Sequence, residues 1–112
     1  MKNQTKINYN EVLSLSAALA QKGGAPGAKP YGVLQLPGDA STRRYFRVTA
    51  EDSSWVLMLM DAYDRKTNNF LLMQAVLKRA GVAVPEVLAD SPELGAILLQ
   101  DLGDKTMLHH LN

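Results

Sequence analysis

The sequence predicts an α+β fold: a five-stranded antiparallel sheet with one helix packed on a face, preceded by an N-terminal helix. Three observations support this class. Five short segments have the apolar or alternating pattern of strands, and polar turns separate most of them. Residues 67–80 instead repeat apolar side chains every three or four positions, as an amphipathic helix does. The connections between successive strands are short enough for antiparallel neighbours.

Composition limits the function classes. A chain of 112 residues forms one domain or part of one. Its formal net charge of +1 gives no general attraction to nucleic acid or membrane, and we predict neither as a partner. The absence of cysteine excludes disulfides and thiolate metal sites and fits a cytoplasmic protein. No apolar run approaches the ~20 residues of a membrane span.

Residues 1–30 are predicted to form an N-terminal helix and a connector. Asn10 is expected to cap the helix, with Glu11 in its first turn. The helix should end near Lys22, because the Gly/Pro-rich run 23–27 stops helices. This helix would cover part of one face of the sheet.

The first three strands are predicted at 31–36, 45–49 and 55–60. Alternation in the second strand places Phe46 and Val48 on one face, and Tyr45, Arg47 and Thr49 on the other. The third strand is almost wholly apolar, so we expect a central strand that is covered on both faces.

The helix over 67–80 is expected to begin at Thr67 or Asn68. Its predicted inward stripe consists of Phe70, Met73, Val76, Leu77 and Ala80. Two further strands follow at 86–90 and 96–100, and the second of these has the apolar character of a buried strand.

The turn between the first two strands has the residue types that hold phosphate. It contains Gly38, Asp39, Ser41, Thr42, Arg43 and Arg44. Backbone N–H groups, hydroxyls and guanidinium groups together can bind a phosphate. By local chemistry alone, a hairpin turn with two solvated arginines is the favoured interpretation of this stretch, because short Gly-containing phosphate motifs often match by chance.

Four segments in order resemble a known family. They read L-P-G-D-A-S-T-R-R-Y-F-R-V at 36–48, V-L-M-L-M-D-A at 56–62, G-V-A-V-P-E-V-L-A-D at 81–90 and I-L-L-Q-D-L-G-D at 97–104. The pattern resembles the aminoglycoside phosphotransferase superfamily, most closely its bacterial N-acetylmuramate/N-acetylglucosamine anomeric sugar kinases. The resemblance covers about two thirds of the chain and implies a protein-kinase-like N-terminal lobe at 31–103.

The resemblance implies a role for each candidate residue. The turn residues named above would hold the phosphates of ATP. After the fifth strand, the Gln100 carbonyl and the Leu102 N–H would read the adenine edge at a hinge. The apolar adenine slot would be supplied by Leu36, Val48, Met58 and Met60. The cofactors implied are ATP and Mg²⁺, with the Mg²⁺ ligands in a second lobe.

Two departures from the kinase pattern are visible. Met58 occupies the position of the strand-three lysine, and Gln74 lies near that of its glutamate partner, so the usual ion pair cannot form. No H-G-D-x-x-x-x-N loop is present, and His109 and His110 have no suitably spaced ligand for a metal. We therefore expect residues 104–112 to lead into a C-terminal lobe that is missing from this chain.

The sequence thus predicts the ATP-binding lobe of a phosphotransferase acting on a small hydroxylated substrate, most closely the anomeric hydroxyl of an amino sugar in cell-wall recycling. Kinases for an aminoglycoside, homoserine or choline remain open, because selectivity lies in the other lobe. A non-catalytic kinase-like binding module is the second alternative, which the missing lysine and glutamate favour.

Overall fold

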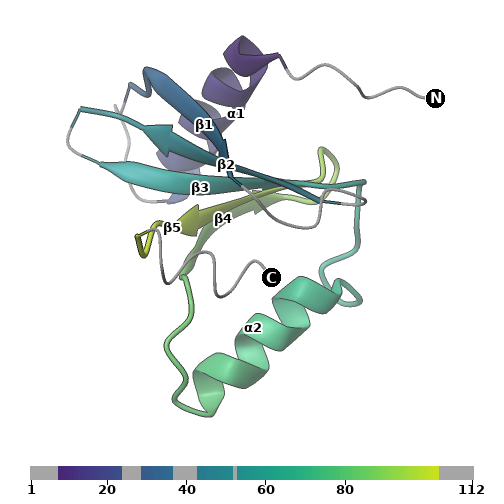
Figure 1. Cartoon of the computed structure of the whole chain (residues 1–112). Helices are drawn as coiled ribbons and strands as arrows, with labels where there is room; N and C mark the ends of the chain where they lie inside the picture. Colours follow the sequence, from purple (N-terminus) through teal and green to yellow (C-terminus); the bar gives the residue numbers. More distant parts are fainter. Residues whose placement is uncertain (1–7, 24–28, 37–42, 52, 104–112) are drawn as a thin grey trace.

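The computed structural model describes residues 8–23, 29–36, 43–51 and 53–103 (Figure 1). Its helices and strands are, in chain order, α1 (Tyr9–Gly23), β1 (Gly32–Leu36), β2 (Arg44–Thr49), β3 (Ser54–Leu59), α2 (Asn69–Arg79), β4 (Val87–Ser91) and β5 (Ala96–Gln100). These strands overlap all of the predicted ones, and they form one antiparallel sheet. The predicted α+β class is confirmed.

The strand order in the sheet is β1-β2-β3-β5-β4. The first three strands form the expected meander, and β5 returns between β3 and β4. Because β3 pairs with β2 on one side and β5 on the other, it is a central strand, as its apolar sequence predicts. In this register Met58 lies between Tyr45 of β2 and Ile97 of β5.

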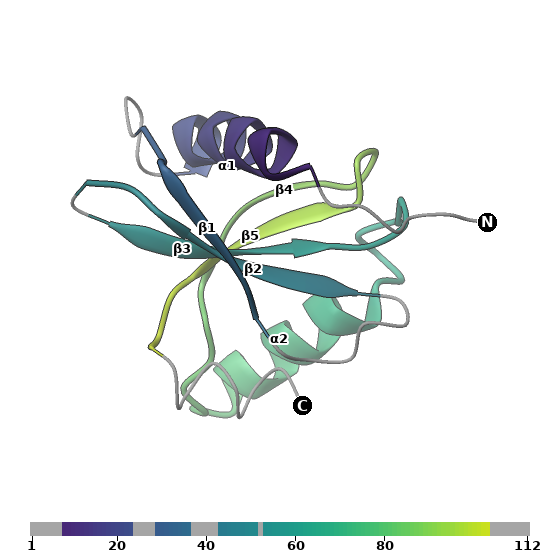
Figure 2. The ribbon, with the colours of Figure 1, turned by 45° about the horizontal axis from the view of Figure 1, so that its top comes forward.

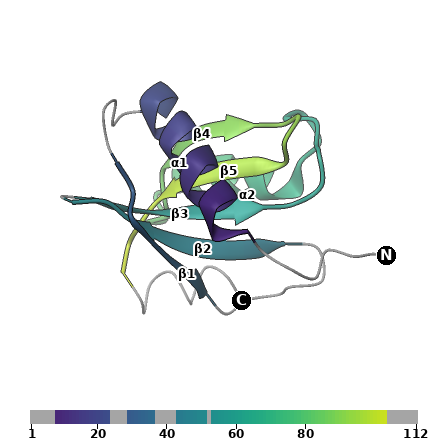
Figure 3. The same cartoon turned by 90° about the horizontal axis from the view of Figure 1, so that it is seen from above.

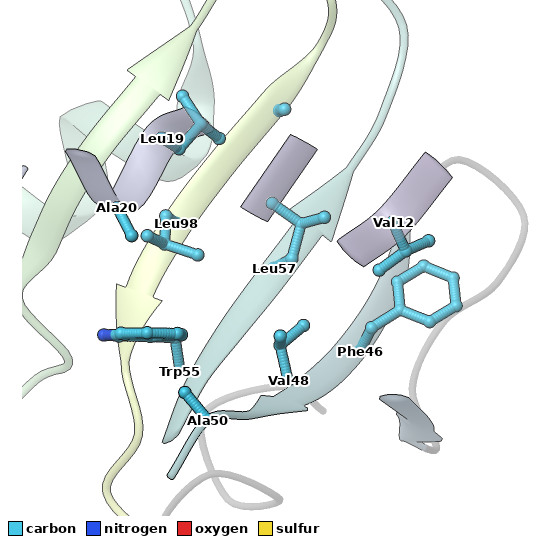
Figure 4. Close-up of a cluster of buried hydrophobic side chains, with 10 residues drawn as sticks. Val12, Leu19, Ala20, Phe46, Val48, Ala50, Trp55, Leu57 and Leu98 are labelled. Atoms are coloured by element: carbon cyan, nitrogen blue, oxygen red, sulfur yellow. The ribbon is translucent and has the colours of Figure 1, made fainter. Parts of the chain in front are cut away.

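The two helices lie on opposite faces of the sheet (Figure 2). α1 crosses one face and contacts β1, β4 and β5 (Figure 3). Beneath it is a group that we call the α1-side cluster (Figure 4), with the buried members Val12, Leu19, Ala20, Phe46, Val48, Ala50, Trp55, Leu57, Ala96 and Leu98. The N-terminal helix therefore covers part of this face of the sheet, as expected.

The other face carries a second apolar group, which we call the α2-side cluster. Its buried members are Tyr45, Val56, Met58, Ile97 and Leu99. Packed against them are Leu36, Met60, Tyr63, Phe70, Leu71, Val87 and Leu102. The alternation predicted for β2 is thus correct, since its even-numbered apolar residues face α1 and Tyr45 faces α2.

The predicted inward stripe of α2 is partly wrong. Met73 and Val76 are 56% and 57% exposed, whereas Leu71 packs against the α2-side cluster. The packed face is rotated around the helix towards Leu71 and Gln74. A polar residue can lie there because the Gln74 amide donates a 2.7 Å hydrogen bond to the Pro85 carbonyl.

The two helix caps gave different outcomes. The prediction of Asn10 as the cap of α1 is wrong, because the Asn8 side chain accepts hydrogen bonds from the backbone N–H groups of Asn10 (2.9 Å) and Glu11 (3.3 Å). For α2, Asn68 is the cap and accepts from the Leu71 N–H at 3.0 Å. Both caps satisfy N–H groups that the first helical turn leaves unpaired.

Candidate functional site

The predicted phosphate-binding turn joins two paired strands. Leu36 at the end of β1 lies opposite Tyr45 near the start of β2, so the connection is a hairpin, as the sequence predicts. Four of the predicted turn residues lie outside the described residues: Gly38, Asp39, Ser41 and Thr42. Their contact with phosphate stays a prediction.

The two arginines after this turn lie at the start of β2. The Arg43 guanidinium carbon is 5.7 Å from the centroid of the Phe70 ring, in the first turn of α2. Such a cation–π contact contributes about 0.5–1 kcal/mol at an exposed site. Arg44 is the first residue of β2 and pairs with Leu59 of β3. Arg43 is therefore positive charge held beside the N-terminal end of α2, which itself favours anions.

Met58 is fully buried at the centre of the α2-side cluster. Leu36 and Met60 pack against the same cluster, so three of the four residues expected for an adenine slot share one face. The fourth, Val48, is wrong: it belongs to the α1-side cluster on the opposite face. Met58 and Gln74 are both uncharged and form no ion pair. The Gln74 amide instead donates to the Pro85 carbonyl.

The predicted hinge begins where β5 ends. The Gln100 N–H donates to the Glu86 carbonyl at 2.8 Å, and the Gln100 side-chain oxygen accepts from the Glu86 N–H at 3.1 Å. Leu102 is half-buried and packs against the α2-side cluster, on the same side of the sheet as Met58. The hinge residues are thus adjacent to the face that carries the candidate slot.

Between these two residues, Asp101 makes a network that the sequence analysis did not identify. Its carboxylate accepts from Arg47 Nε at 2.7 Å and Arg47 Nη2 at 3.1 Å. It also accepts from the Ser54 hydroxyl at 2.8 Å and the Gly103 N–H at 3.0 Å. We call this network the Asp101 brace. The only sequence signal for it is the alternation that places Arg47 on the α2 side, since its partner is 54 residues away.

The brace changes the acidity of Asp101. Burial raises the pKa of this carboxyl group, but hydrogen bonds from Arg47, the Gly103 backbone and Ser54 outweigh burial. The net pKa is below the ordinary value for aspartate. Asp101 is therefore an anion that arginine neutralises, with a side chain only 7% exposed.

A second network of the same type lies at the opposite end of β5. Asp90 accepts from Arg65 Nε and Nη2, both at about 3 Å, and from the Tyr63 hydroxyl at 2.8 Å. We call it the Asp90 network. Burial raises the pKa of Asp90, but the hydrogen bonds from Arg65 and Tyr63 lower it by a larger amount. The net pKa of Asp90 is therefore below its ordinary value. Burial, and then the bond to Asp90, raise the pKa of Tyr63.

A groove of about 700 Å³ lies apart from the predicted nucleotide site. It is lined by the first turns of α1, by Leu59 and Met60 at the end of β3, and by Leu94. None of the residues predicted to form the nucleotide site lines it, apart from Met60. Within the ranges that the structure describes, no three His, Cys, Asp or Glu side chains are grouped to hold a metal, and no helix is long and apolar enough to cross a membrane.

The order and pairing of these elements are those of a kinase-like N-terminal lobe: three antiparallel strands, one helix, and two strands that complete the sheet. The sequence model of the Phosphotransferase enzyme family (APH) matches residues 32–111, which is more than half of the chain. This chain belongs to the Phosphotransferase enzyme family.

Three curated relatives have the same name, N-acetylmuramate/N-acetylglucosamine kinase. The Pseudomonas aeruginosa protein is 39% identical over 83 residues, covering 74% of this chain and 25% of the relative. The Pseudomonas putida protein is 37% identical over 77% of this chain and 26% of the relative. The Neisseria meningitidis serogroup B protein is 42% identical over 62% of this chain and 21% of the relative. The chain thus spans about a quarter of the length of these relatives, and no solved structure gives a significant match.

Proposed function

We propose that this chain is the nucleotide-binding lobe of an ATP-dependent sugar kinase, with the lobe itself at 31–103. The observation that carries the proposal is the position of Arg43, Met58 and Leu102. They come from the start of β2, the middle of β3 and the segment after β5, yet all lie on the α2 side of the sheet. A cation for phosphate, an apolar surface for a base and a backbone hinge, arranged on one face, are the parts that ATP requires.

In this proposal the phosphates lie against the turn after β1. Arg43 and Arg44 supply the positive charge that a strand-three lysine supplies in other kinases, because Met58 is neutral. Met58 instead lies beneath the adenine slot, whose apolar surface comes from Leu36 and Met60, both half-buried against the same cluster. The Gln100 carbonyl accepts from the adenine amino group, and the Leu102 N–H donates to the ring. Mg²⁺, when bound, would neutralise charge on the phosphates, and its protein ligands would lie in the part of the enzyme that corresponds to the rest of the relatives' length.

The substrate proposal comes from the relatives. We propose transfer of the γ-phosphoryl group of ATP to the anomeric oxygen of N-acetylmuramate or N-acetylglucosamine. The bond from the γ-phosphorus to the β–γ bridging oxygen breaks, ADP leaves, and the proton of the anomeric hydroxyl goes to a base in the second lobe. This reaction would belong to cell-wall recycling in the cytoplasm. The test is a substrate panel on the protein purified from its own cells. Phosphorylation of either sugar, but not of choline, homoserine or an aminoglycoside, is expected, and the reverse preference would contradict the substrate proposal.

A chimera tests the role of the lobe. The 112 residues would replace the matching first quarter of the Pseudomonas aeruginosa kinase, and sugar phosphorylation would be followed with ATP. We expect activity that falls by about tenfold or more on Arg43→Ala, because a charge-assisted contact to phosphate is lost. A folded chimera that binds the sugar but transfers no phosphate would contradict the proposal.

A non-catalytic binding module is the second candidate, and the pair Met58 and Gln74 favours it. Met58 is fully buried and Gln74 bonds to the backbone, so the residues that usually hold the phosphates are absent from these positions. The affinity of this chain for Mg·ATP distinguishes the two candidates. The kinase lobe predicts measurable binding, and the non-catalytic module predicts none.

A further inference from the structure

The Asp101 brace ties three parts of the sheet to one side chain. The carboxylate receives two hydrogen bonds from Arg47 on β2, one from Ser54 on β3 and one from the Gly103 backbone. The Asp101 side chain is 7% exposed and that of Arg47 17%. A two-pronged arginine–carboxylate pair fixes direction as well as distance, and partial burial strengthens it. The hydrogen bonds to its carboxylate therefore hold Asp101 in one conformation.

Gln100, the residue before Asp101, is held by the chain segment that precedes β4. Gln100 exchanges hydrogen bonds with the backbone of Glu86, through its own N–H and through its side-chain oxygen. The segment that leaves β5 is thus bonded to β2 and β3 on one flank and to the residue before β4 on the other. A short connection with this many tertiary hydrogen bonds has little freedom to change its backbone dihedral angles.

Two peptide units meet at Asp101. The Gln100 carbonyl belongs to the unit before it, and the Leu102 N–H belongs to the unit after it. Because peptide units are planar, φ and ψ of Asp101 alone set the relative direction of these two groups. A side chain that fixes Asp101 therefore fixes an acceptor and a donor at a constant separation.

We infer that Asp101 is a positioning residue that makes the site selective for adenine over guanine nucleotides; this inference rests on the proposed function. Adenine offers an amino donor beside a ring-nitrogen acceptor, which suits a carbonyl and an N–H held side by side. Guanine offers a carbonyl acceptor beside an N–H donor at the corresponding edge, and this reversed pattern leaves both backbone groups unpaired. Discrimination requires a rigid pair, since a flexible one could rotate to fit either base.

The chain contains a matched control for this inference. In the Asp90 network, Arg65 contacts a carboxylate with two nitrogens and the Tyr63 hydroxyl adds a third hydrogen bond, at the other end of β5. Asp90→Asn therefore removes the same kind of interaction as Asp101→Asn without touching the hinge. A merely structural role predicts that the two variants behave alike in nucleotide binding.

The experiment measures the dissociation constants of ATP, GTP and inorganic tripolyphosphate for the 112-residue chain and for both variants. We expect Asp101→Asn to reduce the preference for ATP over GTP by about tenfold, which corresponds to losing about one well-placed hydrogen bond. Tripolyphosphate affinity should stay within about twofold. Asp90→Asn should leave the ATP/GTP ratio unchanged. Ser54→Ala, which removes one bond of the brace, should shift the ratio in the same direction, and it serves if Asp101→Asn fails to fold.

The outcomes separate the inference from the proposed function. If the unmodified chain prefers ATP but Asp101→Asn and Ser54→Ala keep that preference, the positioning role is wrong and the nucleotide site stands. Equal loss of selectivity in the Asp90→Asn control also overturns the positioning role, since it shows a general effect of stability. If the unmodified chain binds none of the three ligands, the proposed function fails and the inference fails with it.

Discussion

Gly95 is the residue at which a single methyl group should be most damaging. It lies in the turn between β4 and β5 with a φ of +68°, and a Cβ there would overlap the carbonyl oxygen of Met60. The Gly95 carbonyl also accepts a 2.8 Å hydrogen bond from the Met60 N–H. Alanine would therefore meet both a backbone conformation that L-residues avoid and a backbone carbonyl of the residue that is hydrogen-bonded to Gly95.

The magnitude follows from two contributions. Alanine in the left-handed region destabilises the folded state by about 1–2 kcal/mol. Alanine also lowers the conformational entropy of the unfolded chain, which offsets about 0.5 kcal/mol of this loss. Displacing the Met60 carbonyl adds about 2 kcal/mol through strain and the weakened hydrogen bond. We expect Gly95→Ala to lower the free energy of unfolding by about 3 kcal/mol, a large part of the stability of a small domain.

Gly81 supplies the control. Its φ is +85°, but a Cβ at this position would have no atom of the described part of the chain within 4 Å. Gly81→Ala should therefore show the conformational cost alone, about 1 kcal/mol. Urea unfolding followed by the fluorescence of Trp55, the single tryptophan and 5% exposed, measures both variants. Equal losses at Gly95 and Gly81 would refute the argument from the Met60 contact.

Three further predictions use the same urea assay. Ser16→Ala should raise the free energy of unfolding by about 1 kcal/mol, because the Ser16 hydroxyl is fully buried and has no hydrogen-bond partner among the described residues; a loss of stability would show that the hydroxyl is hydrogen-bonded. Leu71→Ala should cost about 1–2 kcal/mol and Val76→Ala almost nothing, because only Leu71 packs against the α2-side cluster; the opposite ranking would restore the stripe predicted from the sequence. The lowered pKa of Asp101 means that its stabilising effect is complete above the ordinary aspartate pKa of about 4 and is lost as the pH falls through the lower folded-state value. The stability gap between the unmodified chain and Asp101→Asn should thus narrow below about pH 4, and a constant gap would contradict the assignment.

Much of the fold is local in origin, and that part is predictable from the sequence. The apolar run of β3 predicts a strand that is covered on both faces, and the alternation of Phe46 and Val48 with Tyr45 predicts which side chains share a face. Each pattern follows from strand geometry without knowledge of the partner. The element order then follows because turns and helix caps are encoded within a few residues.

Most features that differ from the predictions depend on contacts between distant residues. The packed face of α2 is rotated from the predicted apolar stripe because the polar Gln74 faces inward and bonds to the Pro85 carbonyl. The spacing of apolar residues cannot indicate an inward polar residue. The resemblance implies Val48 as part of the adenine slot, whereas the alternation along β2 puts it with Phe46 in the α1-side cluster. The Asp101 brace joins residues 54 positions apart, so neither partner is recognisable before the sheet is assembled.

The central claim is that the α2 side of the sheet binds a nucleotide, and amide chemical-shift mapping tests it most directly. Mg·ATP would be titrated into the ¹⁵N-labelled chain, with Mg²⁺ alone as the control. The account predicts saturable shifts at Arg43, Arg44 and the segment 100–103, with none at Leu94 beside the groove below α1. Shifts confined to Leu94 and the first turn of α1, or no shift at millimolar Mg·ATP, would contradict it.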